Sequence, residues 1–225
     1  MSTVTIVGGH GKVALRAAPL LADNGHTVRS LIRKQEQADD VREAGAEPVV
    51  EDVTQLDEDQ IADVFRGSDV VVWSAGAGGS GEEETWAIDR DAAIRTMEAA
   101  KKAGVQRYVM VSFFNSHMVD GEFPGVDKSE DMYAYFNAKV QADEHLRNSG
   151  LDWTIVGPSA LTLDEPTGKI DVQEGIELRD VNVPTTSRGN VARVVAAAVD
   201  ENKTIGKQIN FHDGETPVAE ALAAV

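Results

Sequence analysis

Short apolar runs alternate with segments of helical periodicity along the whole chain. Runs rich in β-branched residues predict seven strands, at residues 4–7, 27–32, 47–50, 69–73, 107–111, 153–156 and 208–211. Apolar residues spaced three and four apart predict helices at residues 12–22, 57–65, 86–103, 135–148 and 188–199. This alternation is typical of βαβ units, in which a helix returns the chain so that successive strands run parallel.

Two of the predicted strands, at residues 70–73 and 108–111, are apolar without interruption. Strands of a parallel sheet are buried on both faces and show this pattern, whereas half-exposed strands alternate. Glycines at 25, 67, 104 and 150 mark helix ends just before a strand resumes. We therefore expect an α/β fold: a doubly wound, mostly parallel sheet of about seven strands with helices on both faces.

Length and composition predict one domain over residues 1–225, because no linker, repeat or low-complexity run interrupts the pattern. A formal charge of -17 argues against nucleic-acid and membrane partners, since both surfaces are anionic. The chain contains no cysteine, which excludes disulfides and cysteine metal sites. We expect a cytoplasmic protein whose partner is a small-molecule substrate, and the sequence leaves monomer and homodimer open.

A glycine-rich turn follows the first predicted strand and opens the first predicted helix. Gly8, Gly11 and Ala14 form a G-x-x-G-x-x-A pattern, in which the glycines allow a tight turn and close approach of a pyrophosphate to the backbone. Free N–H groups at the helix start then bind the phosphates. The residues predicted to hold a dinucleotide here are Gly8, Gly9, His10, Gly11, Lys12 and Val13. His10 is expected to cap the backbone or to lie beside the phosphates, and we assign no metal because no second histidine is suitably spaced.

The end of the second predicted strand indicates which dinucleotide is bound. Arg33 stands where an NAD enzyme usually has an acidic residue for the ribose hydroxyls, and Lys34 follows it. A guanidinium there can pair with a 2′-phosphate, which favours NADP (NADPH); the alternative is a solvated basic turn. Residues after the third and fourth strands are expected to border adenine and ribose: Asp52, Val53, Ala75, Gly76 and Ala77.

Several segments together resemble the short-chain dehydrogenase/reductase superfamily, in its atypical NAD(P)-binding, epimerase/dehydratase-like (NmrA-like) branch. The matching segments are residues 8–11 (GGHG), 89–94 (DRDAAI), 104–112 (GVQRYVMVS), 138–143 (AKVQAD), 152–158 (DWTIVGP) and 213–218 (DGETPV). The resemblance implies a Rossmann fold that binds NADP. It also implies that the backbone of Pro158, Ser159 and Ala160 lies near the nicotinamide.

The same resemblance implies a catalytic tyrosine and lysine. Tyr135 and Lys139 have the family's spacing, one helical turn apart on one face. Lys139 would favour the phenolate form of Tyr135 and bind the nicotinamide ribose, while the phenol exchanges a proton with the substrate oxygen. Where family enzymes carry a serine or threonine this chain has Phe114, so Ser112 is the candidate at the strand tip; Asn115 or Ser116 could substitute, and the phenylalanines equally suggest an apolar wall.

The sequence therefore predicts an NADP-dependent oxidoreductase that reduces a small carbonyl-type substrate. Loops at residues 113–133 and 158–185 are expected to form the substrate region. The alternative is a non-enzymatic NADP-binding sensor or regulatory protein, which the absence of the usual serine favours. A sugar-nucleotide epimerase/dehydratase ranks third, because little chain remains after the sixth strand for a substrate domain.

Overall fold

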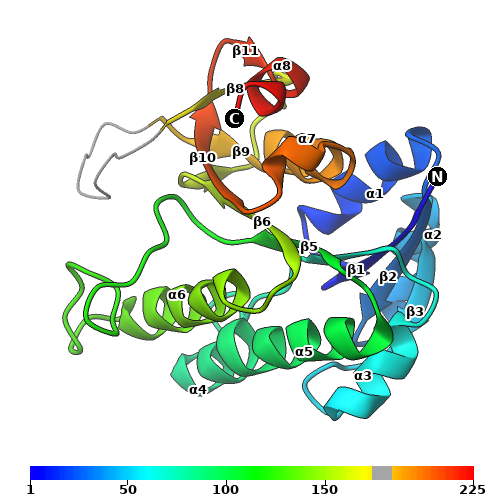
Figure 1. Cartoon of the computed structure of the whole chain (residues 1–225), viewed down its shortest axis with the longest axis horizontal. Coiled ribbons are helices and arrows are strands. Elements are labelled where there is room, and N and C mark those ends of the chain that lie inside the picture. The colour runs from blue at the N-terminus through cyan, green and yellow to red at the C-terminus, as the bar shows by residue number, and fades with distance from the viewer. Residues whose placement is uncertain (174–183) are drawn as a thin grey trace.

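A central sheet organises the chain, as the computed structural model shows for residues 1–173 and 184–225 (Figure 1). Its parallel strands are β1 (Thr3–Val7), β2 (Thr27–Ile32), β3 (Glu47–Val50), β4 (Val70–Trp73), β5 (Arg107–Val111), β6 (Asp152–Pro158) and β10 (Lys207–Asp213). They lie in the order β3-β2-β1-β4-β5-β6-β10, so the direction of winding reverses at β1 and β4. Open parallel sheets bind ligands at such a reversal, outside the carboxyl ends of the strands.

The predicted α/β class with a mostly parallel sheet is confirmed, but the sheet has nine strands in the described residues rather than about seven. Strand β8 (Lys169–Val172) pairs antiparallel with β10, and β11 (Thr216–Pro217) pairs antiparallel with β8. A separate two-stranded ribbon joins β7 (Leu161–Thr162) to β9 (Thr186–Ser187). The two-residue strands β7, β9 and β11 are too short to give a sequence signal, and β8, Lys-Ile-Asp-Val, interrupts its apolar residues with charged ones. Pairing with a neighbour rather than local pattern makes them extended.

Helices cover both faces of the sheet (Figure 1). On one face lie α1 (Ala14–Asp23), α7 (Arg188–Asp200) and α8 (Val218–Ala223), with η1 (Gln35–Gln37), α2 (Ala38–Glu43) and η3 (Asn202–Thr204) near its edges. On the other lie α3 (Glu58–Phe65), α4 (Glu82–Thr85), the π-helical segment η2 (Trp86–Ala92), α5 (Ala93–Ala103) and α6 (Tyr133–Arg147). No helix in the described parts of the chain is long and apolar enough to cross a membrane.

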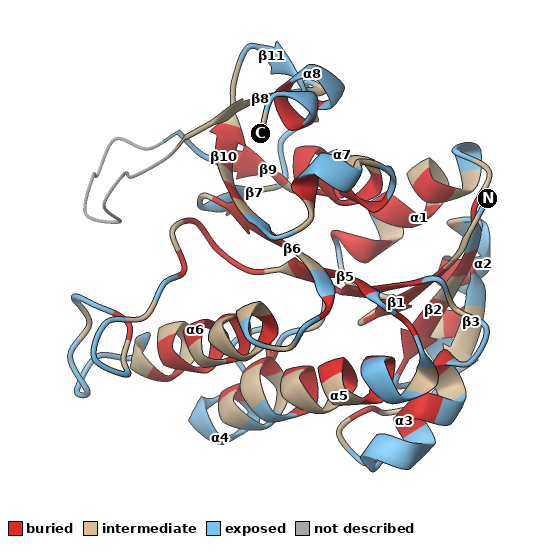
Figure 2. Cartoon of the chain, viewed as in Figure 1, coloured by how far each residue is buried: buried red, intermediate tan, exposed pale blue. Residues whose placement is uncertain are grey.

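The core forms two apolar layers, one on each face, and the buried sides of the helices turn toward it (Figure 2). Strand β4 shows how the layers arise. Val70 and Val72 pack against the α1 and α7 face, whereas Val71 and Trp73 pack against α3 and α5. Successive side chains of a strand point to opposite faces, so a strand between two helix layers is apolar throughout.

The helix predicted at residues 86–103 begins as a π-helix and continues as α5. It ends at Gly104, which takes the left-handed conformation (φ 78°) typical of a helix C-cap. The wider π turn holds Asp89 in the interior, where its side chain is 2% exposed. Because π-helical segments concentrate at functional sites, this departure from α-helix directs attention to Asp89.

Candidate functional site

The glycine-rich turn between β1 and α1 is packed too tightly to accept side chains. Gly8 has φ 81°, and a Cβ added there would lie 2.6 Å from the Cα of Ala75. A Cβ on Gly9 would lie 2.4 Å from the Cβ of Ser30. The N–H of Gly11 donates to the carbonyl of Gly8 at 2.9 Å and closes the turn. The turn therefore needs glycine so that its backbone can fold against the ends of β2 and β4.

A pocket of about 280 Å³ opens beside this turn, at the carboxyl ends of the parallel strands. Among the residues that line it are eight of the predicted cofactor residues: Gly8, His10, Gly11, Arg33, Asp52, Val53, Ala75 and Gly76. Within the described residues, the N–H groups of Lys12 and Val13 donate to no protein acceptor. Lys12 and Val13 directly follow Gly11, which lines the pocket, and free N–H groups at the start of a helix suit a phosphate. This side of the pocket therefore fits the phosphate end of a dinucleotide.

His10 links the turn to the segment that follows β2. Its Nε2 lies 2.7 Å from Asp40 Oδ2, and its Nδ1 lies 3.2 Å from Gln37 Nε2. The same segment carries Arg33, which is exposed, lines the pocket and forms no ion pair with any described carboxylate. An unpaired guanidinium at this position is available to an anionic group of a ligand.

A second pocket, of about 620 Å³, lies between the segment after β4 and the start of α6. Its lining includes Ala77 and Asp89 from the chain between β4 and α5, and Tyr133 and Tyr135 from α6. Ala77, which was expected with its neighbours to border adenine and ribose, therefore lines this pocket rather than the first one. The neighbouring Gly76 lines the first pocket, so the two cavities adjoin along this segment.

Tyr135 and Lys139 lie four residues apart in α6, and the lysine ammonium is close to the tyrosine ring. The Nζ atom of Lys139 lies 5.9 Å from the centroid of the Tyr135 ring and donates to the carbonyl of Val111 at 3.2 Å. It lies 3.6 Å from Asp89 Oδ1, and the other oxygen of Asp89 accepts from the N–H of Ala77 at 2.9 Å. The geometry connects the catalytic tyrosine and lysine predicted from the sequence to a carboxylate in η2.

Burial and charge act in opposite directions on Lys139, whose side chain is 5% exposed. Burial alone favours the neutral amine. The negative charge of Asp89, together with Tyr135 and Asp143, outweighs burial and raises the pKa of Lys139 above its usual value. The lysine therefore carries a positive charge at neutral pH, and its ammonium lies 5.9 Å from the centroid of the Tyr135 ring.

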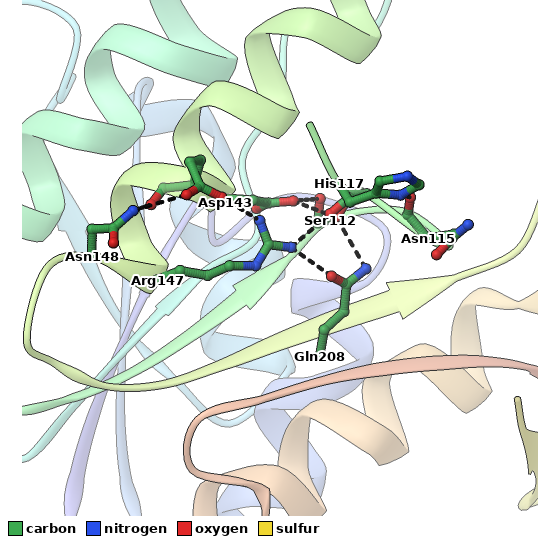
Figure 3. Close-up of polar contacts among 9 residues, drawn as sticks. Ser112, Asn115, His117, Asp143, Arg147, Asn148 and Gln208 are labelled. Carbon is green, nitrogen blue, oxygen red and sulfur yellow. Dashed lines mark hydrogen bonds and ion pairs between the residues drawn. The ribbon is translucent and has the colours of Figure 1, made fainter. Parts of the chain in front are cut away.

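A buried polar network holds the tip of β5 against α6 (Figure 3). The hydroxyls of Ser112 and Ser116 both donate to Asp143 Oδ2 at 2.5 Å. Arg147 donates to the carbonyl of Ser116 at 2.6 Å and to Gln208 Oε1 at 2.5 Å, and Gln208 Nε2 donates to the hydroxyl of Ser116 at 3.2 Å. Burial raises the pKa of Asp143, against the opposing effects of Lys139, the two serine hydrogen bonds and Arg147.

Two aromatic side chains contact the ring of Tyr135. Its ring centroid lies 6.1 Å from that of Phe113 and 5.5 Å from that of Phe136. Phe123 completes the cluster, 5.4 Å from Phe113 and 4.8 Å from Phe136. Aromatic pairs at these separations are stabilising, so the loop at residues 113–133 restricts the orientation of the Tyr135 ring.

A comparison with known families decides the class of this protein. A family model described as NAD(P)H-binding matches residues 8–202, which include the glycine-rich turn, η2 and α6. The chain belongs to the NAD(P)H-binding family. YhfK of Bacillus subtilis (strain 168), described as an uncharacterised sugar epimerase, is 34% identical over 221 residues, which cover 97% of this chain and 98% of the relative.

Two solved structures resemble this NAD(P)H-binding protein over nearly its whole length. A protein from Bacillus halodurans, provisionally named an NAD-dependent epimerase/dehydratase, has a TM-score of 0.88 and 34% identity, with 100% of both chains covered. The oxidoreductase ylbE from Lactococcus lactis has a TM-score of 0.82 and 29% identity, with 99% of this chain and 96% of that chain covered. The resemblance to an NAD(P)-binding, epimerase/dehydratase-like family is thereby confirmed.

Other residues predicted for the site of this NAD(P)H-binding protein lie outside both pockets. They are Gly9, Lys12, Val13, Lys34, Ser112, Lys139, Pro158, Ser159 and Ala160. Ser112 is buried, with its hydroxyl directed to Asp143, and Ser159 Oγ donates to the carbonyl of Pro184 at 2.6 Å. Part of the loop predicted at residues 158–185, namely 174–183, lies outside the described residues.

Asp89 and Asp143 are the buried carboxylates that sequence reasoning missed. Each stands on an inward-facing helix position, where the apolar spacing of η2 and α6 predicts an alanine or leucine. An acidic residue on such a face needs a partner, because an unpaired buried charge is very costly. That inconsistency is the sequence signal by which they could have been found, although it does not identify the partner.

Proposed function

We propose that this protein is an NADPH-dependent oxidoreductase that reduces a small carbonyl compound, with Tyr135 as the proton donor. The observation that carries the proposal is the position of Tyr135, which lines the second pocket while the buried ammonium of Lys139 lies 5.9 Å from its ring centroid. The relatives named as an oxidoreductase and as epimerases support chemistry that uses a nicotinamide.

The residues of the chain suit NADPH at both ends of the site. The free N–H groups of Lys12 and Val13 would hold the pyrophosphate, and the unpaired Arg33 would hold the 2′-phosphate. Lys139 would hold the nicotinamide ribose. When bound, the cofactor supplies the hydride, and the protein supplies binding, orientation and charge.

The proton comes from the chain itself. The phenol of Tyr135 would donate its proton to the substrate oxygen as that oxygen becomes negative, and the ammonium of Lys139 stabilises the phenolate that remains. Asp89 keeps the lysine charged, as the raised pKa of Lys139 indicates. Phe113 and Phe136 restrict the ring, which reduces the entropy cost of aligning the hydroxyl with the substrate.

The test compares Tyr135→Phe with Tyr133→Phe. Both tyrosines line the second pocket, but the Tyr133 hydroxyl already donates to Glu122 Oε1 at 3.0 Å. NADPH oxidation over a panel of small aldehydes and ketones should fall on the order of 100-fold in Tyr135→Phe and much less in Tyr133→Phe. Background oxidation over the whole panel, or equal losses in the two variants, would contradict the proposed function.

One observation favours a second candidate, a dinucleotide sensor without catalysis. Ser112 and Ser116, the serines nearest the place where family enzymes orient a carbonyl, both donate their hydroxyls to Asp143. The sensor hypothesis predicts NADPH binding without turnover and a protein partner whose capture depends on NADPH. Steady turnover by the isolated protein excludes it.

A further inference from the structure

The second pocket carries an excess of negative charge. The carboxylates that line it belong to Glu82, Asp89, Glu130 and Asp131, whereas Lys128 is the one positively charged residue among the described lining residues. The tyrosine proposed as proton donor lines the same cavity. Charged groups around a cavity act on whatever enters it, so this lining bears directly on the substrate.

The positive groups near the pocket are already engaged. Lys128 Nζ lies 3.0 Å from Glu122 Oε1, and Lys139, which does not line the pocket, is paired with the lining residue Asp89. By contrast, Glu82 and Asp131 form no ion pair with any described residue. Both lysines are thus already paired with a carboxylate. The negative charges of Glu82, Glu130 and Asp131 have no positive partner among the described residues.

The helix beside the pocket does not offset this charge. Helix α4 begins at Glu82, and its first turn holds Glu82, Glu83 and Glu84. Acidic side chains in a first turn oppose the partial positive charge of the helix start, so α4 offers little attraction to an anion. The first pocket is also lined by two carboxylates, Glu51 and Asp52, but it differs because its Arg33 forms no ion pair with a described residue and the N–H groups of Lys12 and Val13, next to its Gly11, have no protein acceptor.

From this difference we infer that the second pocket selects substrates that carry no negative charge. The inference rests on the proposed function, which makes this cavity the substrate site. It separates the roles of the two pockets: phosphates belong to the first, and an uncharged or cationic carbonyl compound belongs to the second. A sugar nucleotide, whose diphosphate needs positive partners, does not suit the second pocket.

The experiment uses three aldehydes of similar size: 4-methylbenzaldehyde, 4-carboxybenzaldehyde and 4-(trimethylammonio)benzaldehyde. We expect kcat/KM for the carboxylate to be on the order of tenfold lower than for the neutral aldehyde at low salt. The cation should be reduced at least as well as the neutral compound. Added salt should reduce the difference in kcat/KM, because three of the lining carboxylates, those of Glu82, Glu130 and Asp131, are exposed. An anion reduced as well as the neutral aldehyde, or a cation disfavoured equally with the anion, overturns the inference.

Substitution of two lining carboxylates, with a matched control, tests whether the pocket itself causes the discrimination against the anionic aldehyde. Glu82→Gln and Asp131→Asn should each reduce the discrimination against the anion, whereas Glu83→Gln should reduce it less. Glu83 lies in the same helical turn as Glu82 but does not line the pocket. Equal effects of Glu82→Gln and Glu83→Gln would show that the general acidity of the protein, rather than the pocket, repels the anion.

Binding separates the failure of this inference from the failure of the proposed function. If no aldehyde is reduced, the proposed function fails, and the affinities of benzyl alcohol, benzylammonium and benzoate for the NADPH-loaded protein are compared by NMR titration. Benzoate should bind most weakly, and UDP-glucose should not bind in the second pocket. Benzoate binding as tight as benzyl alcohol, or UDP-glucose shifting resonances of residues 128–135, overturns the charge selection whether or not the protein is an enzyme.

Discussion

The ion pair between Asp89 and Lys139 allows the sharpest test of how the site is built. Asp89→Asn removes one negative charge while keeping an oxygen that can accept from the N–H of Ala77. The lost attraction across 3.6 Å is roughly 4–5 kcal/mol at an effective dielectric constant of about 20. Removing one partner of a buried pair typically costs about 3–5 kcal/mol, because the other charge stays buried without compensation. We expect Asp89→Asn to lower the free energy of unfolding by about 4 kcal/mol at pH 7.

The assay is urea unfolding followed by tryptophan fluorescence, with Asp91→Asn as the matched control. Asp91 lies in the same segment and pairs with Arg90 at 2.6 Å, but its side chain is 47% exposed, so its loss should cost well under about 1 kcal/mol. A double-mutant cycle with Lys139→Met isolates the pair. Equal costs for the two aspartate variants, or strictly additive effects in the cycle, would refute the reasoning.

The pH dependence of the free energy of unfolding tests independently whether Asp89 stabilises the charged form of Lys139. The folded pKa of Lys139 is raised, so its contribution to stability is fully present below the unfolded lysine pKa, about 10.4, and is lost as pH rises through the folded value. In Asp89→Asn burial is no longer opposed by that carboxylate, and the lysine releases its proton more easily. The stability deficit of the variant should therefore shrink as pH rises toward 10, and a deficit that grows would contradict the assignment.

Three further perturbations probe other parts of the site. Arg33→Ser should weaken NADPH binding on the order of tenfold in a fluorescence titration and NADH binding much less; equal losses would remove the case for NADP. Gly9→Ala should destabilise the protein by about 1–3 kcal/mol in urea, since its Cβ would lie 2.4 Å from Ser30, and Ser30→Gly should recover part of the loss unless the clash is not the cause. Burial raises the pKa of Asp143, so the folded protein favours the protonated carboxyl. The contribution of Asp143 to the free energy of unfolding is therefore present at low pH and lost as pH rises through the folded pKa. Asp143→Asn, measured against wild type, should gain relative stability between pH 4 and 7, and a flat difference would count against this.

Local pattern was enough for the parts of this protein that depend on neighbours along the chain. Apolar runs located the seven parallel strands, and glycine spacing located the turn between β1 and α1. Both signals arise from backbone geometry and from burial on two faces, which nearby residues report directly. The same signals did not reveal β8 or β11. Strand β8 has charged residues between its apolar ones and β11 has two residues, and both are extended because they pair with β10 and β8.

The family and the spacing of Tyr135 and Lys139 were likewise readable from the sequence, because a helix places residues four apart on one face. Only the tertiary structure decided what those side chains meet. Asp89 reaches Lys139 across 50 positions of chain, and Ser112 turns to Asp143 because α6 packs against the tip of β5. The negative charge of the second pocket also depends on the tertiary structure. Glu82 and Asp131 line the same cavity only because α4 and the start of α6 enclose it. Buried charges and hydroxyls must be paired, and their partners come from segments distant in the sequence that folding brings together. The periodicity of apolar residues therefore cannot identify those partners.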